Sequence, residues 1–220
     1  MPIFFQQQIN PTTRLGIWKI EETEDFFLSN VPLQREVTHP HKRLQHLSGR
    51  FLLQFLFPGF PYELIRIADT RKPYLPDEEY HFSISHCGDY AAAIVSSDHR
   101  VGIDIEIPSP RIHLIAKKFL SEREKEYLSM EDKLFLDQWG MKDKAETEFL
   151  TFLWSAKESI FKWYGRGQVD FSDHMTLNGD ICIRDDDSLE MPFLFSKHED
   201  EHLIILGRLI DQLALAWIMT

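Results

Sequence analysis

The sequence is poor in cysteine, in clustered positive charge and in long apolar runs. Only Cys87 and Cys182 occur among its 220 residues, so we expect a reducing compartment, the cytoplasm, and no disulfide framework. The net charge of −11 argues against a general nucleic-acid binder, because phosphate backbones require grouped Lys and Arg. No apolar run reaches the roughly 18 residues of a membrane span, and we expect no secretory signal.

Several common site motifs are also absent. The sequence contains no Gly-x-x-x-x-Gly-Lys-Ser/Thr loop, no Gly-x-Gly-x-x-Gly fingerprint and no His-Glu-x-x-His pair. Its ten histidines do not have the spacing of zinc ligands. The 43% apolar content and the length nevertheless allow a real core, in one large domain or two small ones.

Helical periodicity occurs in both halves of the sequence. Pro40 stands at the first position of a helix predicted over about 39–57. A longer helix is predicted over about 147–164. Ser121 and Glu124 have the spacing of a capping box at the start of a further helix.

Alternating apolar and polar residues predict strands between these helices. The predicted strands are 14–20, 81–85, 90–96 and 101–106. We expect the last three of these strands to form a hairpin or meander. Because both halves combine helices with an antiparallel sheet, the predicted class is α+β. We place an N-terminal subdomain at 1–100 and a C-terminal subdomain at 101–220.

Two acids interrupt an otherwise apolar strand. A strand alternates its side chains, so Asp104 and Glu106 leave one face while Val101, Ile103 and Ile105 fill the other. Neighbouring carboxylates raise each other's pKa unless a cation lies between them. A hard divalent ion between the carboxylates commonly removes this repulsion and leaves open coordination positions for phosphate. The alternative interpretation of the pair is an exposed strand face without function. The pair indicates magnesium and phosphate chemistry.

Charged residues also occur on the helix predicted over 147–164. Glu158 and Lys162 are four positions apart, and an exposed ion pair worth about 0.3–0.5 kcal/mol is at least as good an interpretation as a functional pair. Lys157 falls among the apolar positions, where a lysine is costly unless it meets an anion.

A second group of cations lies in the N-terminal half. Arg43, His46 and Arg50 recur at helical spacing, and such a face suits a phosphate monoester. A solvated surface is an equally good interpretation of these three residues. His86 follows a predicted strand, where a solvated or capping histidine is more common than a ligand.

Four segments, in their order along the chain, resemble the 4′-phosphopantetheinyl transferases of the surfactin-synthetase-activating type. The most specific are Gly-Ile-Asp-Ile-Glu and Trp-Ser-x-Lys-Glu-Ser-x-x-Lys, and the full set is 72–75, 82–86, 101–106 and 154–162. The resemblance covers roughly residues 40–170. It implies two similar α+β subdomains with antiparallel sheets, arranged as a pseudo-dimer within a monomer, with the active site at their interface.

The resemblance implies an activity and its partners. The family moves the 4′-phosphopantetheine arm of coenzyme A onto a serine of an acyl or peptidyl carrier protein and releases 3′,5′-ADP, with Mg²⁺ as the metal. Neither nucleic acid nor a membrane is expected as a partner. The alternatives are an Mg²⁺-dependent phosphoesterase on a coenzyme A-like substrate and a non-catalytic coenzyme A-binding module.

The resemblance also implies roles for single residues. Asp104, Glu106 and Glu158 would coordinate the metal. Lys162 would hold the pyrophosphate in catalysis beside Glu158, and Glu124 would act as the general base. Contacts with coenzyme A would come from Arg43, Arg50, Lys72, Pro73, Ser85, His86, Lys157 and Lys162.

A docking surface for the carrier is predicted from charge. Carrier proteins of this system are acidic, and the present chain is acidic as well. We therefore expect a local basic or apolar surface, formed by Arg111, Ile112, Lys117 and Lys118.

Overall fold

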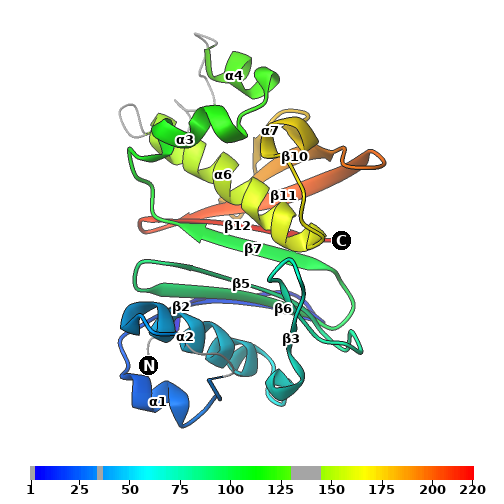
Figure 1. Cartoon of the computed structure of the whole chain (residues 1–220). Coiled ribbons are helices and arrows are strands. Elements are labelled where there is room, and N and C mark those ends of the chain that lie inside the picture. Colours follow the sequence, from blue (N-terminus) through cyan, green and yellow to red (C-terminus); the bar gives the residue numbers. More distant parts are fainter. Residues whose placement is uncertain (1–2, 34–36, 130–144) are drawn as a thin grey trace.

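The computed structural model describes residues 3–33, 37–129 and 145–220. Helices and antiparallel strands are mixed along the chain, so the predicted α+β class is confirmed. Two sheets lie face to face, and helices cover the outer face of each (Figure 1). No helix in the described part of the chain has the length and apolar character that a membrane crossing requires.

The first sheet has four antiparallel strands in the order β1-β2-β6-β5. Their bounds are β1 Ile3–Asn10, β2 Thr13–Lys19, β5 His81–Cys87 and β6 Tyr90–Ser96. Its outer face carries α1 (Glu24–Leu28) and α2 (Pro40–Leu56). A 3₁₀ turn at Tyr62–Leu64 leads to a small separate ribbon made of β3 (Arg66–Ile67) and β4 (Pro73–Tyr74).

The second sheet has the order β7-β12-β11-β10-β8, and β9 pairs with β10. Its strands are β7 Val101–Glu106, β8 Met175–Leu177, β9 Cys182–Ile183, β10 Leu189–Phe195, β11 Glu201–Ile210 and β12 Leu213–Met219. The helices of this half are α3 Ile112–Phe119, α4 Glu122–Ser129, α6 Ala145–Tyr164 and α7 Phe171–His174. Of these, α6 packs along the outer face of the sheet, against β7 and β12.

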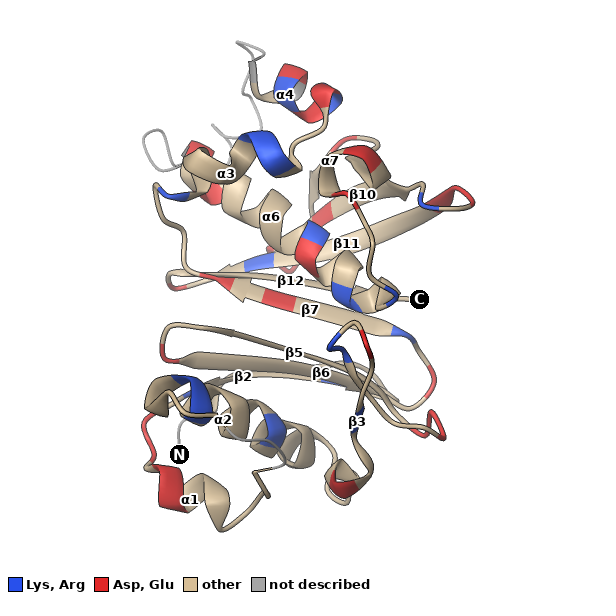
Figure 2. Ribbon diagram, viewed as in Figure 1, with Lys and Arg blue, Asp and Glu red and all other residues tan. Residues whose placement is uncertain are grey.

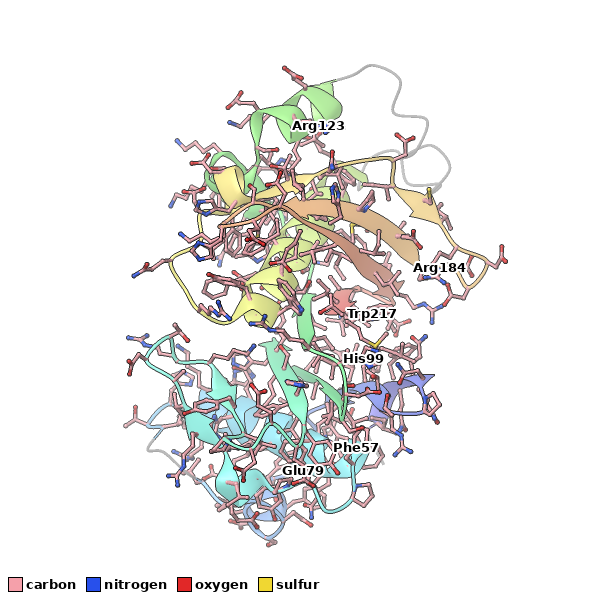
Figure 3. All side chains as sticks on the ribbon, turned by 90° about the vertical axis from the view of Figure 1, so that its right-hand side faces the viewer. Phe57, Glu79, His99, Arg123, Arg184 and Trp217 are labelled. Carbon is pink, nitrogen blue, oxygen red and sulfur yellow. The ribbon has the colours of Figure 1, made fainter. Side chains whose placement is uncertain are left out.

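The inner faces of the two sheets share an apolar core. Leu15 and Ile94 of the first sheet belong to the same buried cluster as Ile103 and Trp217 of the second. Figure 3 shows Trp217 at the level where the two halves meet. The halves are therefore held together by apolar side chains, which fixes the relative position of β5 and β7.

The predicted hairpin is found, but the meander is not. Strands β5 and β6 pair with each other, whereas β7 crosses into the second sheet and pairs with β12, with Asp104 opposite Ala216. The odd-numbered side chains of β7 face the first sheet and complete the shared core. The chain thus changes sheets at residues 97–100; the division into subdomains 1–100 and 101–220 stays a prediction.

Two predicted helix starts are confirmed. The side chain of His39 accepts a hydrogen bond from the Lys42 N–H, and Pro40 is at the first turn of α2. In the capping box of α4, the Ser121 N–H donates to Glu124 Oε2 at 2.8 Å and the Glu124 N–H donates to Ser121 Oγ at 3.3 Å.

Candidate active site

The site lies where α6 packs directly on β7. A Cβ atom at Gly102 would lie 2.0 Å from the backbone oxygen of Ser159, so only glycine allows this approach. The even-numbered residues of β7 share the face on which Gly102 lies. Asp104 and Glu106 consequently lie on the face of β7 that packs against α6, the helix that carries Glu158 and Lys162. Figure 2 shows acidic segments on β7 and both acidic and basic segments on α6.

Asp104 is the centre of the arrangement. Its Oδ1 accepts hydrogen bonds from Lys162 Nζ and Ser85 Oγ, each at 2.7 Å. Lys162 Nζ also donates to Ser85 Oγ at 2.9 Å and to the Ile103 carbonyl at 3.1 Å. These bonds join β5, β7 and α6 at one point. Because Asp104 is only 3% exposed, the alternative of an exposed strand face without function does not hold.

Glu106 and Glu158 lie close enough to Asp104 to feel its charge. Burial, and then the Asp104 carboxylate, raises the pKa of Glu158 to about 7, while Lys162 acts in the opposite direction. Burial followed by Asp104 also raises the pKa of Glu106, which accepts a hydrogen bond from Cys87 Sγ at 3.3 Å. The three acids therefore repel one another across the β7–α6 contact.

The three carboxylates suit a hard divalent cation, although their side chains do not converge on one point in this structure. Among the described residues, no three His, Cys, Asp or Glu side chains are close enough to form a ready metal site. Asp104 Oδ2, however, is buried and receives no hydrogen bond from the described residues. A buried carboxylate oxygen without a donor is costly, and a cation beside it would remove that cost and the repulsion among the acids.

A cavity of about 220 Å³ opens beside Lys162. Lys72, Pro73 and Phe161 of α6 form part of its wall. The Nζ of Lys72 donates to the Trp163 carbonyl at 3.2 Å. Burial, followed by the charge of Arg100, lowers the pKa of Lys72 to about 8.

His86 lies next to Ser85 near the end of β5 and is exposed. Partial loss of water, and then the charge of Lys162, lowers the pKa of His86. Lys42 at the start of α2 contributes in the same direction, so it lies close to His86. Sequence reasoning did not identify Lys42 as a candidate site residue, because the helical spacing of Arg43 and Arg50 pointed to another face of the same helix.

Comparison with known proteins shows the family of this chain. The model of the family described as "4′-phosphopantetheinyl transferase superfamily" matches residues 100–215, which are just over half of the chain. This chain belongs to the 4′-phosphopantetheinyl transferase superfamily.

Individual members of the superfamily are also similar. The 4′-phosphopantetheinyl transferase Sfp of Bacillus subtilis (strain 168) is 34% identical over 183 residues, which are 76% of this chain and 76% of that protein. A 4′-phosphopantetheinyl transferase of Bacillus subtilis is 33% identical over 61% of this chain, and the match spans 58% of that relative's length. Enterobactin synthase component D of Escherichia coli O157:H7 is 31% identical over 55% of this chain and 54% of its own.

Two residues expected at the transferase site lie elsewhere. Lys157 is fully buried and its Nζ donates to Glu124 Oε2 at 2.6 Å, to the Phe119 carbonyl at 2.6 Å and to the Phe171 carbonyl at 3.0 Å. An ammonium group has three donors, so none is left for a pyrophosphate. The expected contact of Lys157 with coenzyme A is therefore corrected.

Glu124 is the buried partner of that lysine. Its Oε2 accepts from Lys157 and from the Ser121 N–H, and its Oε1 accepts from the Leu177 N–H at 2.9 Å. With 1% exposure, this carboxylate holds α4, α6 and β8 together and does not reach the acids at β7. The structure therefore does not support its expected role as general base and gives it a structural one, in a buried ion pair.

The two arginines of α2 are also engaged. Arg43 makes a bidentate ion pair with Glu24, at 2.7 and 2.8 Å, and a hydrogen bond to the Val37 carbonyl. Arg50 is 4% exposed and its Nε donates to His46 Nε2 at 3.0 Å. Neither arginine is among the described residues that line the cavity beside Lys162, and their expected contacts with a phosphate of coenzyme A stay a prediction.

Proposed function

We propose that this protein transfers the 4′-phosphopantetheine arm of coenzyme A to a serine of an apo carrier protein, giving holo carrier and 3′,5′-ADP. The observation that carries the proposal is the Asp104–Lys162–Ser85 node beside two further acids and a cavity. It occurs in a chain that belongs to the phosphopantetheinyl transferase superfamily.

Coenzyme A would bind along the cavity between Lys72 and Lys162. Lys72 and Pro73 would hold its nucleotide part, and the neighbouring Ser85 and His86 would contact its phosphates. Lys162 would bind the pyrophosphate, because it lines the cavity and its ammonium group lies 2.7 Å from Asp104 Oδ1.

Asp104, Glu106 and Glu158 would hold Mg²⁺. The ion would supply charge stabilisation to the phosphoryl oxygens and to the leaving 3′,5′-ADP. The unbonded Asp104 Oδ2 and the mutual repulsion of the acids support this assignment.

The reaction places two demands on the protein. The carrier serine attacks the β-phosphorus while 3′,5′-ADP departs, so cationic groups must face the phosphoryl oxygens; Lys162 is such a group. The serine proton needs an acceptor, and Glu124 lies too far inside the fold. Glu158 is the acceptor we propose, since its carboxylate is half-buried at the site beside Lys162 and Asp104.

The direct test is incubation of the protein with an apo carrier, coenzyme A and Mg²⁺, followed by the intact mass of the carrier. We expect a mass gain equal to one phosphopantetheine and the release of 3′,5′-ADP only when the carrier is present. Release without a carrier would indicate the phosphoesterase instead. Binding of coenzyme A without any product would indicate the non-catalytic module.

A pH dependence follows from Lys72. This lysine loses its proton as the pH rises through about 8, so its attraction for a phosphate is present below that pH and lost above it. We predict that the affinity for 3′,5′-ADP, measured by calorimetry, falls about tenfold between pH 7 and pH 9.5. Lys72→Arg should remove most of this decrease because arginine stays charged; an equal decrease in the variant would contradict the assignment.

The carrier would dock on α3. Arg111, Lys117 and Lys118 are exposed, as expected, but Ile112 is 8% exposed and belongs to the core. Leu114, which is 74% exposed, provides the apolar contact in its place. A basic and apolar helix of this kind suits an acidic partner.

Charge reversal tests this surface. We predict that Lys117→Glu combined with Lys118→Glu raises the KM for the carrier about tenfold or more and leaves the affinity for coenzyme A unchanged. Lys125→Glu on the neighbouring helix α4 is the control, and it should have a smaller effect. An unchanged carrier KM in the double variant would exclude α3 as the docking helix. A monomeric state and a cytoplasmic location remain predictions.

A further inference from the structure

A second and larger cavity, of about 500 Å³, adjoins the one beside Lys162. The two cavities share Lys72, Pro73, Phe82 and Gly165. The larger cavity continues toward the start of β7 and the end of α6. Asp104 and Lys162 are not among its described lining residues, so it lies outside the proposed transfer centre.

Three cations gather around this cavity in a chain whose net charge is −11. They are Lys72, Arg100 and Arg166. Burial and then Arg166 lower the pKa of Arg100, and burial and then Arg100 lower the pKa of Lys72, so the three charges repel one another. One acid, Glu78, lines the described part of the cavity and offsets this only in part.

Both arginines are held in place by aromatic rings. The Arg100 guanidinium lies 4.8 Å from the ring centroid of Trp163, and one of its nitrogens donates to the Tyr164 carbonyl. The Arg166 guanidinium lies 5.9 Å from the ring centroid of Tyr164. Arg166 forms no ion pair with any residue that the structure describes. Oriented guanidinium groups with free donors are suited to a carboxylate or phosphate.

The rest of the wall is largely apolar or aromatic. Tyr74, Leu75, Tyr80 and Val101 contribute to it. Small-molecule sites commonly have volumes of roughly 300–1,000 Å³ and combine apolar walls with a few polar groups that fix the ligand. The larger cavity has both features.

We propose that this cavity binds a small organic anion with an apolar body and a carboxylate or phosphate head, at a site separate from the transfer centre. The head would contact Arg100 and Arg166, and the body would pack against Tyr74, Leu75 and Tyr80. The ligand would also contact the wall of the transfer cavity, because Lys72 and Pro73 belong to both.

The test uses 1-anilinonaphthalene-8-sulfonate, a fluorescent aromatic anion, in the presence of saturating 3′,5′-ADP. We expect saturable binding to the wild-type protein that Arg166→Glu weakens at least about tenfold. The control Arg184→Glu should leave it unchanged, because Arg184, which follows β9 and is labelled in Figure 3, is not among the described lining residues of the cavity. Both arginines are exposed, so both variants should fold.

Competition then identifies the head group. Displacement of the probe by octanoate indicates a carboxylate ligand, and displacement by AMP indicates a phosphate ligand. Four results would overturn the proposal: no saturable binding, full displacement by 3′,5′-ADP, equal affinity in Arg166→Glu, or displacement by neither competitor.

Discussion

Asp104→Asn should lower kcat/KM for phosphopantetheinyl transfer by about a hundredfold to a thousandfold. The substitution keeps the size of the side chain but removes the charge that faces Lys162. It also replaces one carboxylate oxygen by an amide group; Oδ2 is buried and receives no hydrogen bond from the described residues. Asparagine would neither hold a divalent cation well nor keep Lys162 in place for the pyrophosphate. The rate is measured as the appearance of holo carrier by intact mass.

The control is Asp185→Asn, which removes an exposed acid in the turn between β9 and β10. It changes the net charge by the same amount and should leave the rate close to that of the wild type. Circular dichroism would show whether the Asp104→Asn variant keeps its fold. A folded variant with more than about a tenth of the wild-type rate would contradict the role of Asp104, since losing a main stabilising group costs more than that.

Lys157→Met should lower the stability of the protein by about 3–5 kcal/mol. The side chains of Lys157 and Glu124 are both inaccessible to solvent and lie 2.6 Å apart. Without the lysine, the buried Glu124 carboxylate loses its counter-ion, and two backbone carbonyls lose a donor. For a chain of this length, the melting temperature should fall by roughly 6–20 °C, which calorimetry or thermal circular dichroism would measure.

Two further variants show whether the loss of stability comes from breaking the buried Lys157–Glu124 ion pair or from another cause. Glu124→Gln combined with Lys157→Met should be more stable than Lys157→Met alone, because no unpaired charge remains. Lys125→Met removes an exposed lysine that pairs with Glu122, and it should change stability by less than about 1 kcal/mol. If Lys157→Met melts at the wild-type temperature, the pair does not hold α4 to α6.

The alternation of residues along 101–106 was sufficient to predict that Asp104 and Glu106 lie on one face of the strand. Alternation along β7 places Asp104 and Glu106 on the side opposite Ile103 and Ile105, as the core cluster between the sheets confirms. The same alternation could not show that β7 changes sheets, because both faces of this strand are buried. The choice between the two sheets depends on pairing with β12, more than a hundred residues later.

Partners distant in sequence account for the differences at the site. Lys162 donates to Ser85 of β5 and to Asp104 and the Ile103 carbonyl of β7, all on other elements than its own helix. The sequence indicated that Lys157 needs an anion, and it finds Glu124, but nothing local distinguished this acid from a phosphate. Arg43 was expected to meet a phosphate and pairs with Glu24 of α1, a contact that only the tertiary fold determines.

Binding of Mn²⁺ in the presence of coenzyme A, followed by electron paramagnetic resonance, tests most directly whether three acids from two distant segments hold one cation. The expected result is a single bound ion per chain in the wild-type protein, with most of this binding lost in Glu158→Ala and in Asp104→Asn. Glu158→Ala should fold but transfer no phosphopantetheine. Binding of Mn²⁺ by both variants with the wild-type affinity would contradict this expectation.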